Sequence, residues 1–386
     1  MIKYLSIICI SLILSSSCKN EESNSNANTK AGNIAQKQAN QQPRNNQSKM
    51  NIAIFPGGAN NSYTSLKLME AFENAAGDNA SNLFQQFWGI SGGSIIASMF
   101  GSGNFTNATD AAKQFKDAAP KILDLNNIIS SINISDLTNI NNMLIEFMND
   151  NNGNRRKNFK AILEQKIPQC EFNQDNKNKM VLITSVDNDP VIYADDYIDI
   201  PGYAKMTNPI SCSDAIIDSS NWQIPKNTII SLAKQKIPMI GLFAGSINQD
   251  FSLFKKAEIT HKNKTSFALD GFYAQGADGN SPLPFAIDYV KSLNEADKTY
   301  NLVVFDNGSP SNQDFRNSLD LNDDIAIIKH DNDVTINIFI ISIKDAQFDK
   351  NLILSDNNSF NYRDNLINSY SQNPQLVFNK AVDAVK

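Results

Sequence analysis

The chain is poor in the side chains that bind transition metals. Its 386 residues include two histidines, His261 and His330, and four cysteines. Their spacing matches no cysteine/histidine zinc site, and the carboxylates at 187–189 and 323–324 lack the pattern of a calcium-binding loop. We therefore expect no metal site and no cofactor.

Clusters of basic residues are also missing. The 34 lysines and arginines are scattered and are outnumbered by 40 acidic residues, which gives a formal net charge of −6. No basic patch with interleaved aromatics indicates nucleic-acid binding, and no basic amphipathic helix indicates tight binding to anionic lipid. The chain has no internal repeat either. We predict no nucleic-acid partner.

Apolar runs long enough to span a bilayer are absent, and the N-terminal run is a short one. Residues 4–14 are apolar and follow Lys3, so residues 1–17 predict a signal peptide. Small residues then precede Cys18, which resembles a bacterial lipoprotein cleavage box, although Ser15 departs from its usual aliphatic residue. We expect a lipid anchor on Cys18 in the cell envelope, and Lys19 fits outer-membrane sorting. An ordinary secretory signal is the alternative.

Apolar residues are nearly absent between the signal peptide and the rest of the chain. Residues 18–49 are rich in Asn, Gln, Ser and Lys, and such a segment buries too little surface to offset the entropy of ordering. We expect a disordered tether at 18–49 and one folded domain over 50–386. This domain keeps Cys170 and Cys212, which are either bonded or two buried thiols.

The stretch Gly89-Ile90-Ser91-Gly92-Gly93 carries the strongest catalytic signal. Residues 84–88 predict a buried strand before it, and residues 94–100 predict a helix after it with Gly101 as the C-terminal cap. In a nucleophile elbow, flanking glycines permit a sharp bend that exposes the serine hydroxyl, and the helix N-terminus faces the reacting centre. Ser91 is therefore the candidate nucleophile. A plain glycine-rich turn is the alternative.

Two more glycines, Gly57 and Gly58, follow an apolar run at residues 50–55. Glycines at a strand end let backbone N–H groups face a ligand oxygen, as an oxyanion hole requires. Together with Gly92 they are the candidate oxyanion donors.

A candidate base lies far downstream. Asp270-Gly271 follows an apolar stretch at 266–269, which places a carboxylate on a tight turn at a strand end. A Ser-Asp dyad needs no histidine, because a partly desolvated carboxylate with a raised pKa can take the serine proton directly. Both histidines stand in polar surroundings, so we expect solvated loops there. His330 remains an alternative base, since it follows Ser91 as in α/β-hydrolases.

These pieces, in this order, resemble the patatin-like phospholipase family. That family runs a glycine-rich oxyanion loop, Gly-x-Ser-x-Gly, then Asp-Gly-Gly or Asp-Gly-Ala with an Asn-x-Pro stretch. The resemblance covers roughly residues 50–290 and rests on 57–59, 89–93, 214–220 (like the family's Ala-x-x-Ala-Ser segment), 270–271 and 280–282.

The chain departs from the family pattern at several positions. Pro56 stands where the glycine run usually begins, Asn60 where an arginine is usual, and Phe272 replaces the third residue of Asp-Gly-Gly. A second Asp-Gly pair begins at Asp278, which is an alternative to Asp270 as the base.

Strand-like and helical runs alternate along the domain, which predicts an α/β fold of three layers with a largely parallel central sheet, as the resemblance also implies. The further strand-like runs are 180–184, 302–305, 324–328 and 335–343, and the helical runs are 158–166, 283–293 and 374–385. Residues 107–149 are interpreted as a surface helix pair or a lid. The insert at 225–262 is interpreted as core packing or an acyl pocket.

The resemblance implies a lipid acyl hydrolase of the phospholipase A or lysophospholipase type, with lipid as substrate and membrane contact through the N-terminal anchor. Ser91 would be the nucleophile and Asp270 the base. A general esterase or thioesterase is one alternative. A catalytically silent surface lipoprotein is another, because Asn60 and the glycine loop depart from the family.

Overall fold

The computed structural model describes residues 49–122, 150, 152–168, 170–172, 175–195, 198–206, 211–224, 227, 250–277, 280–308, 324–343 and 357–386. The predicted signal peptide, Cys18, nearly all of the tether and Asp278 lie outside the described residues. So do residues 123–149 of the predicted helix pair and 228–249 of the predicted insert.

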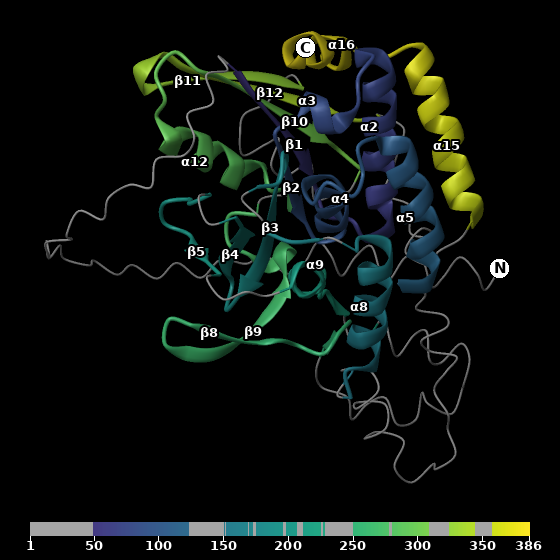
Figure 1. Cartoon of the computed structure of the whole chain (residues 1–386), viewed down its shortest axis with the longest axis vertical. Helices are drawn as coiled ribbons and strands as arrows, with labels where there is room; N and C mark the ends of the chain where they lie inside the picture. The colour runs from purple at the N-terminus through teal and green to yellow at the C-terminus, as the bar shows by residue number, and fades with distance from the viewer. Residues whose placement is uncertain are drawn as a thin grey trace, which may run out of the picture.

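A ten-stranded sheet forms the centre of the domain, in the order β11-β12-β10-β1-β2-β3-β4-β5, with β9 pairing with β3 and β8 with β9 (Figure 1). The five strands from β12 to β3 run parallel, whereas β11 pairs antiparallel with β12, and β4 and β9 each pair antiparallel with β3. The short β5 pairs parallel with β4. The strands span β1 (Lys49–Phe55), β2 (Gln86–Ile90), β3 (Lys179–Val186), β4 (Asp189–Ala194), β5 (Ala204–Lys205), β8 (Glu258–His261), β9 (Lys264–Asp270), β10 (Thr299–Phe305), β11 (Ile325–His330) and β12 (Val334–Ile341). A separate pair joins β6 (Gln223–Ile224) to β7 (Phe251–Ser252).

Helices cover both faces of this sheet, because its parallel strands are apolar on both sides. In β1, Ala53 and Phe55 pack into one core, while Ile52 and Ile54 pack into a second core on the opposite face. On the first side lie α2 (Ser62–Ala76), α4 (Gly92–Gly101), α5 (Ala108–Ile122), α8 (Asn154–Lys166), α9 (Cys212–Ser219), α15 (Asn357–Gln372) and α16 (Leu376–Val385), and on the second α12 (Leu283–Leu293). The predicted three-layer α/β arrangement with a largely parallel sheet is confirmed.

Short helical turns complete the described architecture: α3 (Ala80–Leu83), η2 (Ala59–Asn61), η4 (Gly271–Tyr273) and η6 (Asp331–Asp333). Among the described helices, none is long and apolar enough to cross a bilayer.

The prediction of Gly101 as a helix cap was wrong. Gly101 is the last residue of α4, and Ser102 is the cap. A Cβ on Gly101 would lie 2.4 Å from the Cβ of Met180 in β3, so glycine is needed there for the close approach of helix to strand.

A disulfide resolves the alternatives left open for the two cysteines of the domain. Cys170, shortly after α8, is bonded to Cys212, the first residue of α9, with their Cα atoms 5.4 Å apart. The C-terminal end of α8 is thereby fastened to the N-terminal end of α9.

Candidate active site

Ser91 lies at the turn between β2 and α4, on the carboxyl side of the parallel sheet. Its backbone has φ 52° and ψ −130°, a conformation that is strained for a residue with a side chain. The side chain is half-buried. The local geometry is that of a sharp strand-to-helix turn with a serine at its tip.

The glycines of this turn are required by close packing. A Cβ on Gly89 would lie 2.4 Å from the carbonyl oxygen of Gly93, and a Cβ on Gly93 would lie 2.1 Å from that of Phe55. Any larger residue at either position would force the backbone apart. The Gly-x-Ser-x-Gly spacing therefore reflects the contact of the turn with itself and with β1.

The sheet brings Asp270 to this turn. Ile90, just before Ser91, pairs with Ile183 of β3, and the next residue of β3, Thr184, pairs with Asp270 at the end of β9. Ser91 Oγ donates a hydrogen bond to Asp270 Oδ2 at 2.7 Å. A Cβ on Gly271 would lie 2.4 Å from the Ile183 carbonyl oxygen, so the glycine after Asp270 permits this approach.

The carboxyl group of Asp270 is almost fully buried, with 1% of the residue exposed. Burial raises its pKa from the ordinary value of 3.8 to about 7, although the Phe272 N–H and the Ser91 hydroxyl donate hydrogen bonds to it and lower the pKa. A carboxylate with such a pKa is a far stronger proton acceptor than a solvated one.

The prediction of Gly57 as an oxyanion donor needs correction. Its N–H donates to the carbonyl oxygen of Asn280 at 2.8 Å, so it is not directed at a ligand. Asn280 has a left-handed backbone, with φ 59°, which the sequence pattern around Asn280-Ser281-Pro282 did not indicate.

The peptide bond between Gly57 and Gly58 is oriented by a hydrogen bond to its carbonyl oxygen. The Asn307 side-chain amide, after β10, donates to the Gly57 carbonyl oxygen at 2.8 Å. In a trans peptide the following N–H points the other way, so the Gly58 N–H points away from the Asn307 amide. Among the described residues, none accepts a hydrogen bond from it.

Gly92 lies against the same loop, since a Cβ on it would be 2.5 Å from the Ala59 carbonyl oxygen. As the first residue of α4, it has no acceptor for its N–H within the helix. Gly58 and Gly92 thus offer two backbone donors beside Ser91.

Neither histidine lies near Ser91. His330 pairs with Val334, the first residue of β12, so it stands at the opposite edge of the parallel strands. Four strand spacings of about 4.8 Å also separate β11 from β2. His330 is half-buried at the end of a strand, not in a solvated loop, and it is excluded as the base for Ser91.

His261 was also predicted to be a solvated loop residue, and this was wrong. It ends β8, is 8% exposed, and its Nε2 lies 2.9 Å from Asp189 Oδ2. It pairs with Lys264 at the far end of β9, six residues, or about 20 Å, from Asp270.

Three serine hydroxyls that the sequence did not single out contact the backbone of Ser91. The Ser91 N–H donates to Ser219 Oγ at 3.2 Å, and Ser220 Oγ donates to the Ser91 carbonyl oxygen at 3.0 Å. Ser94 Oγ donates to the same oxygen at 2.5 Å. Ser219 and Ser220 lie in the segment 214–220 that resembles the family, which was the available signal.

No group of three or more His, Cys, Asp or Glu side chains suited to a metal occurs among the described residues. Around Ser91 the described residues present a serine hydroxyl, a buried carboxyl group and backbone N–H donors.

Comparison with known proteins finds structural similarity at low sequence identity. No protein-family model and no curated protein matches the chain. A solved structure of human GIVD cytosolic phospholipase A2 matches with a TM-score of 0.46 at 10% identity, over 90% of this chain and 62% of that one. The same protein in complex with methyl gamma-linolenyl fluorophosphonate and terbium chloride matches with a TM-score of 0.39 at 11% identity, over 88% and 59%. The chain thus spans about 60% of the length of these structures.

Proposed function

We propose that this chain is a serine acyl hydrolase that cleaves carboxylic esters of lipids. The observation that carries the proposal is the hydrogen bond from Ser91 Oγ to the buried carboxyl group of Asp270. Ser91 also has the strained backbone of a nucleophile elbow, at a turn from strand to helix.

The reaction would proceed through an acyl-enzyme. Ser91 Oγ attacks the ester carbonyl carbon while Asp270 takes the hydroxyl proton, and the N–H groups of Gly58 and Gly92 stabilise the resulting oxyanion. Collapse breaks the ester C–O bond, and Asp270 returns the proton to the leaving alcohol. Water then attacks the acyl group with Asp270 again as the base, which releases the fatty acid and regenerates Ser91.

A lipid substrate is favoured by a narrow apolar pocket beside the turn. The pocket lies between α4, α5 and α8, and Ile95, which lines it, follows Ser91 by one helical turn. Its described lining is largely apolar and comprises Asn60, Ile95, Met99, Gln114, Phe115, Ala118, Ala119, Ile162, Leu163, Lys166 and Ile167. The pocket is small, about 20 Å³, so an acyl chain whose carbonyl group is at Ser91 would enter it by moving these side chains apart.

We further propose that the enzyme is fastened to the bacterial cell envelope through a lipid on Cys18, with the polar segment 18–49 as a tether before β1. Two or more acyl chains hold a protein stably on a membrane. Replacing Cys18 by alanine should move the protein from the membrane fraction to a soluble fraction, and unchanged fractionation would contradict the anchor.

Labelling with a long-chain fluorophosphonate, located by mass spectrometry, tests the proposed activity. We expect a covalent adduct on Ser91 and release of fatty acid from phosphatidylcholine or lysophosphatidylcholine, both lost in Ser91→Ala. The control is Ser102→Ala, which removes a buried hydroxyl at the far end of α4. More than about a tenth of wild-type turnover in Ser91→Ala would refute the elbow. Labelling with cleavage of short esters alone would indicate a general esterase, and no labelling would indicate a binding protein.

A further inference from the structure

The end of α9 supports the backbone of Ser91. Ser219 links β3 to the turn, because its hydroxyl accepts from the Ser91 N–H and donates to the Ile183 carbonyl oxygen at 2.6 Å. The Ser220 hydroxyl donates to the carbonyl oxygen of Ser91 and so holds the other side of that residue. A shift of α9 along its axis would therefore move the peptides on both sides of the candidate nucleophile.

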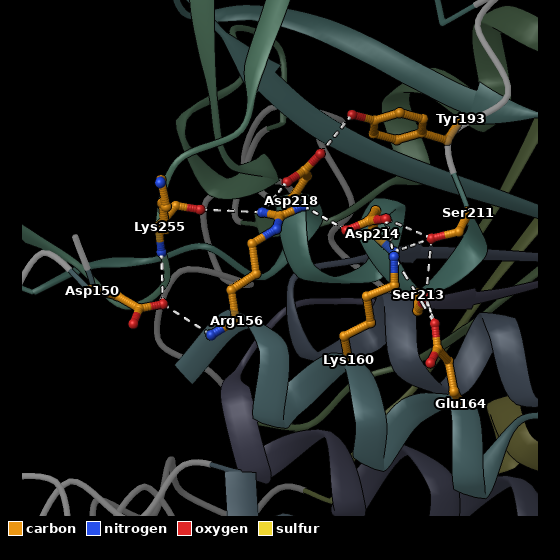
Figure 2. Close-up of polar contacts among 10 residues, drawn as sticks. All are labelled: Asp150, Arg156, Lys160, Glu164, Tyr193, Ser211, Ser213, Asp214, Asp218 and Lys255. Atoms are coloured by element: carbon orange, nitrogen blue, oxygen red, sulfur yellow. Dashed lines mark hydrogen bonds and ion pairs between the residues drawn. The ribbon is translucent and has the colours of Figure 1, made fainter. Parts of the chain in front are cut away.

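Asp218, the residue before Ser219, is buried, and Arg156 of α8 neutralises its charge. Arg156 donates from Nη1 to Asp218 Oδ1 at 2.8 Å and from Nη2 to Asp214 Oδ1 at 3.0 Å, as Figure 2 shows. Tyr193 donates to the other oxygen of Asp218 at 3.2 Å. The side chain of Asp218 is 0% exposed, so its charge depends on these partners instead of water.

Arg156 is itself held in place. Its N–H and that of Arg155 donate to the carboxylate of Asp150 at 2.9 Å, which caps the start of α8. The Asp150 carboxylate also accepts from the Lys255 N–H at 3.1 Å, and Arg156 Nη1 donates to the Lys255 carbonyl oxygen at 3.2 Å (Figure 2). The guanidinium group of Arg156 is therefore held in a fixed position against α9.

We propose that Arg156 and Asp218 form a positioning clamp that holds Ser219 and Ser220 against Ser91 and so sets the orientation of the nucleophile. The two helices are antiparallel, since the Cys170–Cys212 disulfide fastens the other end of α9 beyond the end of α8. Lys160, which bonds Asp214 at 2.6 Å, lies between these two attachments. With both ends fixed, α9 cannot slide along α8, and the hydroxyls at its C-terminal end stay in register with the turn. This inference rests on the proposed function of Ser91.

The test measures how fast the folded protein reacts with a fluorophosphonate at Ser91, together with kcat and KM for an ester. Breaking one partner of a buried ion pair leaves an unpaired charge, so the main variant is the neutral double exchange Arg156→Gln with Asp218→Asn. We expect labelling and kcat to fall at least tenfold, since small misplacements of reacting groups are costly, while KM stays within a few-fold. Arg156→Lys, which keeps a charge beside Asp218, should recover part of the rate.

Lys160→Gln is the matched control, because it removes an ion pair between the same two helices at Asp214. Its labelling rate should stay within about twofold of wild type, since this pair is partly exposed to solvent and the attachments at both ends of α9 remain. An equal loss in Lys160→Gln would mean that general packing of α8 and α9 matters and would overturn the clamp.

A double-mutant cycle tests whether Arg156 acts through Ser220. If it does, Ser220→Ala should cost much less in the Arg156→Gln/Asp218→Asn background than in the wild type, while independent effects would add and overturn the inference. Undiminished labelling of the neutral variant, with only a lower melting temperature, would also overturn it and leave the proposed hydrolase intact. A wild-type protein that does not label at Ser91 would overturn both.

Discussion

Asn307 fixes the orientation of Gly57. Its side-chain amide donates to the Gly57 carbonyl oxygen at 2.8 Å and to that of Pro56 at 3.3 Å, and it lies against Gly58, on which a Cβ would approach the amide to 2.6 Å. A side chain after β10 thereby turns the Gly58 N–H away from the Asn307 amide.

Asn307→Ala should consequently lower kcat about tenfold to a hundredfold and leave KM within a few-fold, because a displaced oxyanion donor weakens binding of the transition state alone. Steady-state kinetics on a soluble ester would measure this. Asn301→Ala is the control, since Asn301 is a buried asparagine in β10 whose amide bonds Asn51 away from Ser91. Equal losses of kcat in the two variants would argue against a role in the oxyanion site.

The pH dependence of the reaction should follow Asp270. Only its carboxylate form can accept the Ser91 proton, and burial raises its pKa to about 7. The rate constant kcat/KM should therefore rise with pH and reach half of its plateau near pH 7, with about a tenth of the plateau one pH unit lower. A solvated aspartate would give a constant rate from about pH 5 upwards, and a profile of that kind would contradict the assignment.

Asp270→Asn should remove activity and raise stability. The folded-state pKa of Asp270 lies above its ordinary value of 3.8, so the protonated form is favoured by folding, and stability is lost as pH rises towards about 7. Asparagine avoids this cost, because it can donate to Ser91 Oγ and accept from the Phe272 N–H.

Thermal melts of wild type and variant at two pH values would measure this effect. Near pH 8 the variant should melt higher by roughly 2–4 °C per kcal/mol gained, and near pH 4 the difference should shrink. A variant that is less stable than wild type at both pH values would show that the buried charge of Asp270 does not destabilise the folded state.

The pairing of Ser91 with Asp270 could be predicted because both residues are fixed by local constraints. Glycines at 89, 93 and 271 are needed for backbone contacts, and the apolar run before Asp270 is the strand that delivers it. Such signals are visible within a few residues of each group.

The errors arose where a distant partner decides the outcome. The Gly57 N–H is taken by Asn280, whose positive φ has no distinctive pattern in the sequence. Polar neighbours suggested a solvated His261, but the β8–β9 pairing places it against Asp189. The contacts of Ser219 and Ser220 with Ser91 likewise depend on how α9 packs, which no local pattern specifies.

Ile95 should control the length of the acyl chain that the enzyme accepts. It is partly buried, lines the apolar pocket and follows Ser91 by four residues on α4. A tryptophan at this position would fill part of the pocket. Each methylene excluded from an apolar site costs about 0.8 kcal/mol, so the loss of two or three methylenes would lower kcat/KM roughly 15- to 60-fold.

Esters of acetate, butyrate, octanoate and palmitate would give the chain-length profile of Ile95→Trp. The shortest esters should be cleaved as by the wild type, while the longest should lose most of their rate. Leu376→Trp is the control, because Leu376 is a 68% exposed residue of α16 outside the pocket lining. Since an added indole changes hydrophobicity equally in both variants, only a loss specific to long chains in Ile95→Trp would place the acyl chain in this pocket. A uniform loss across all esters would instead place it elsewhere.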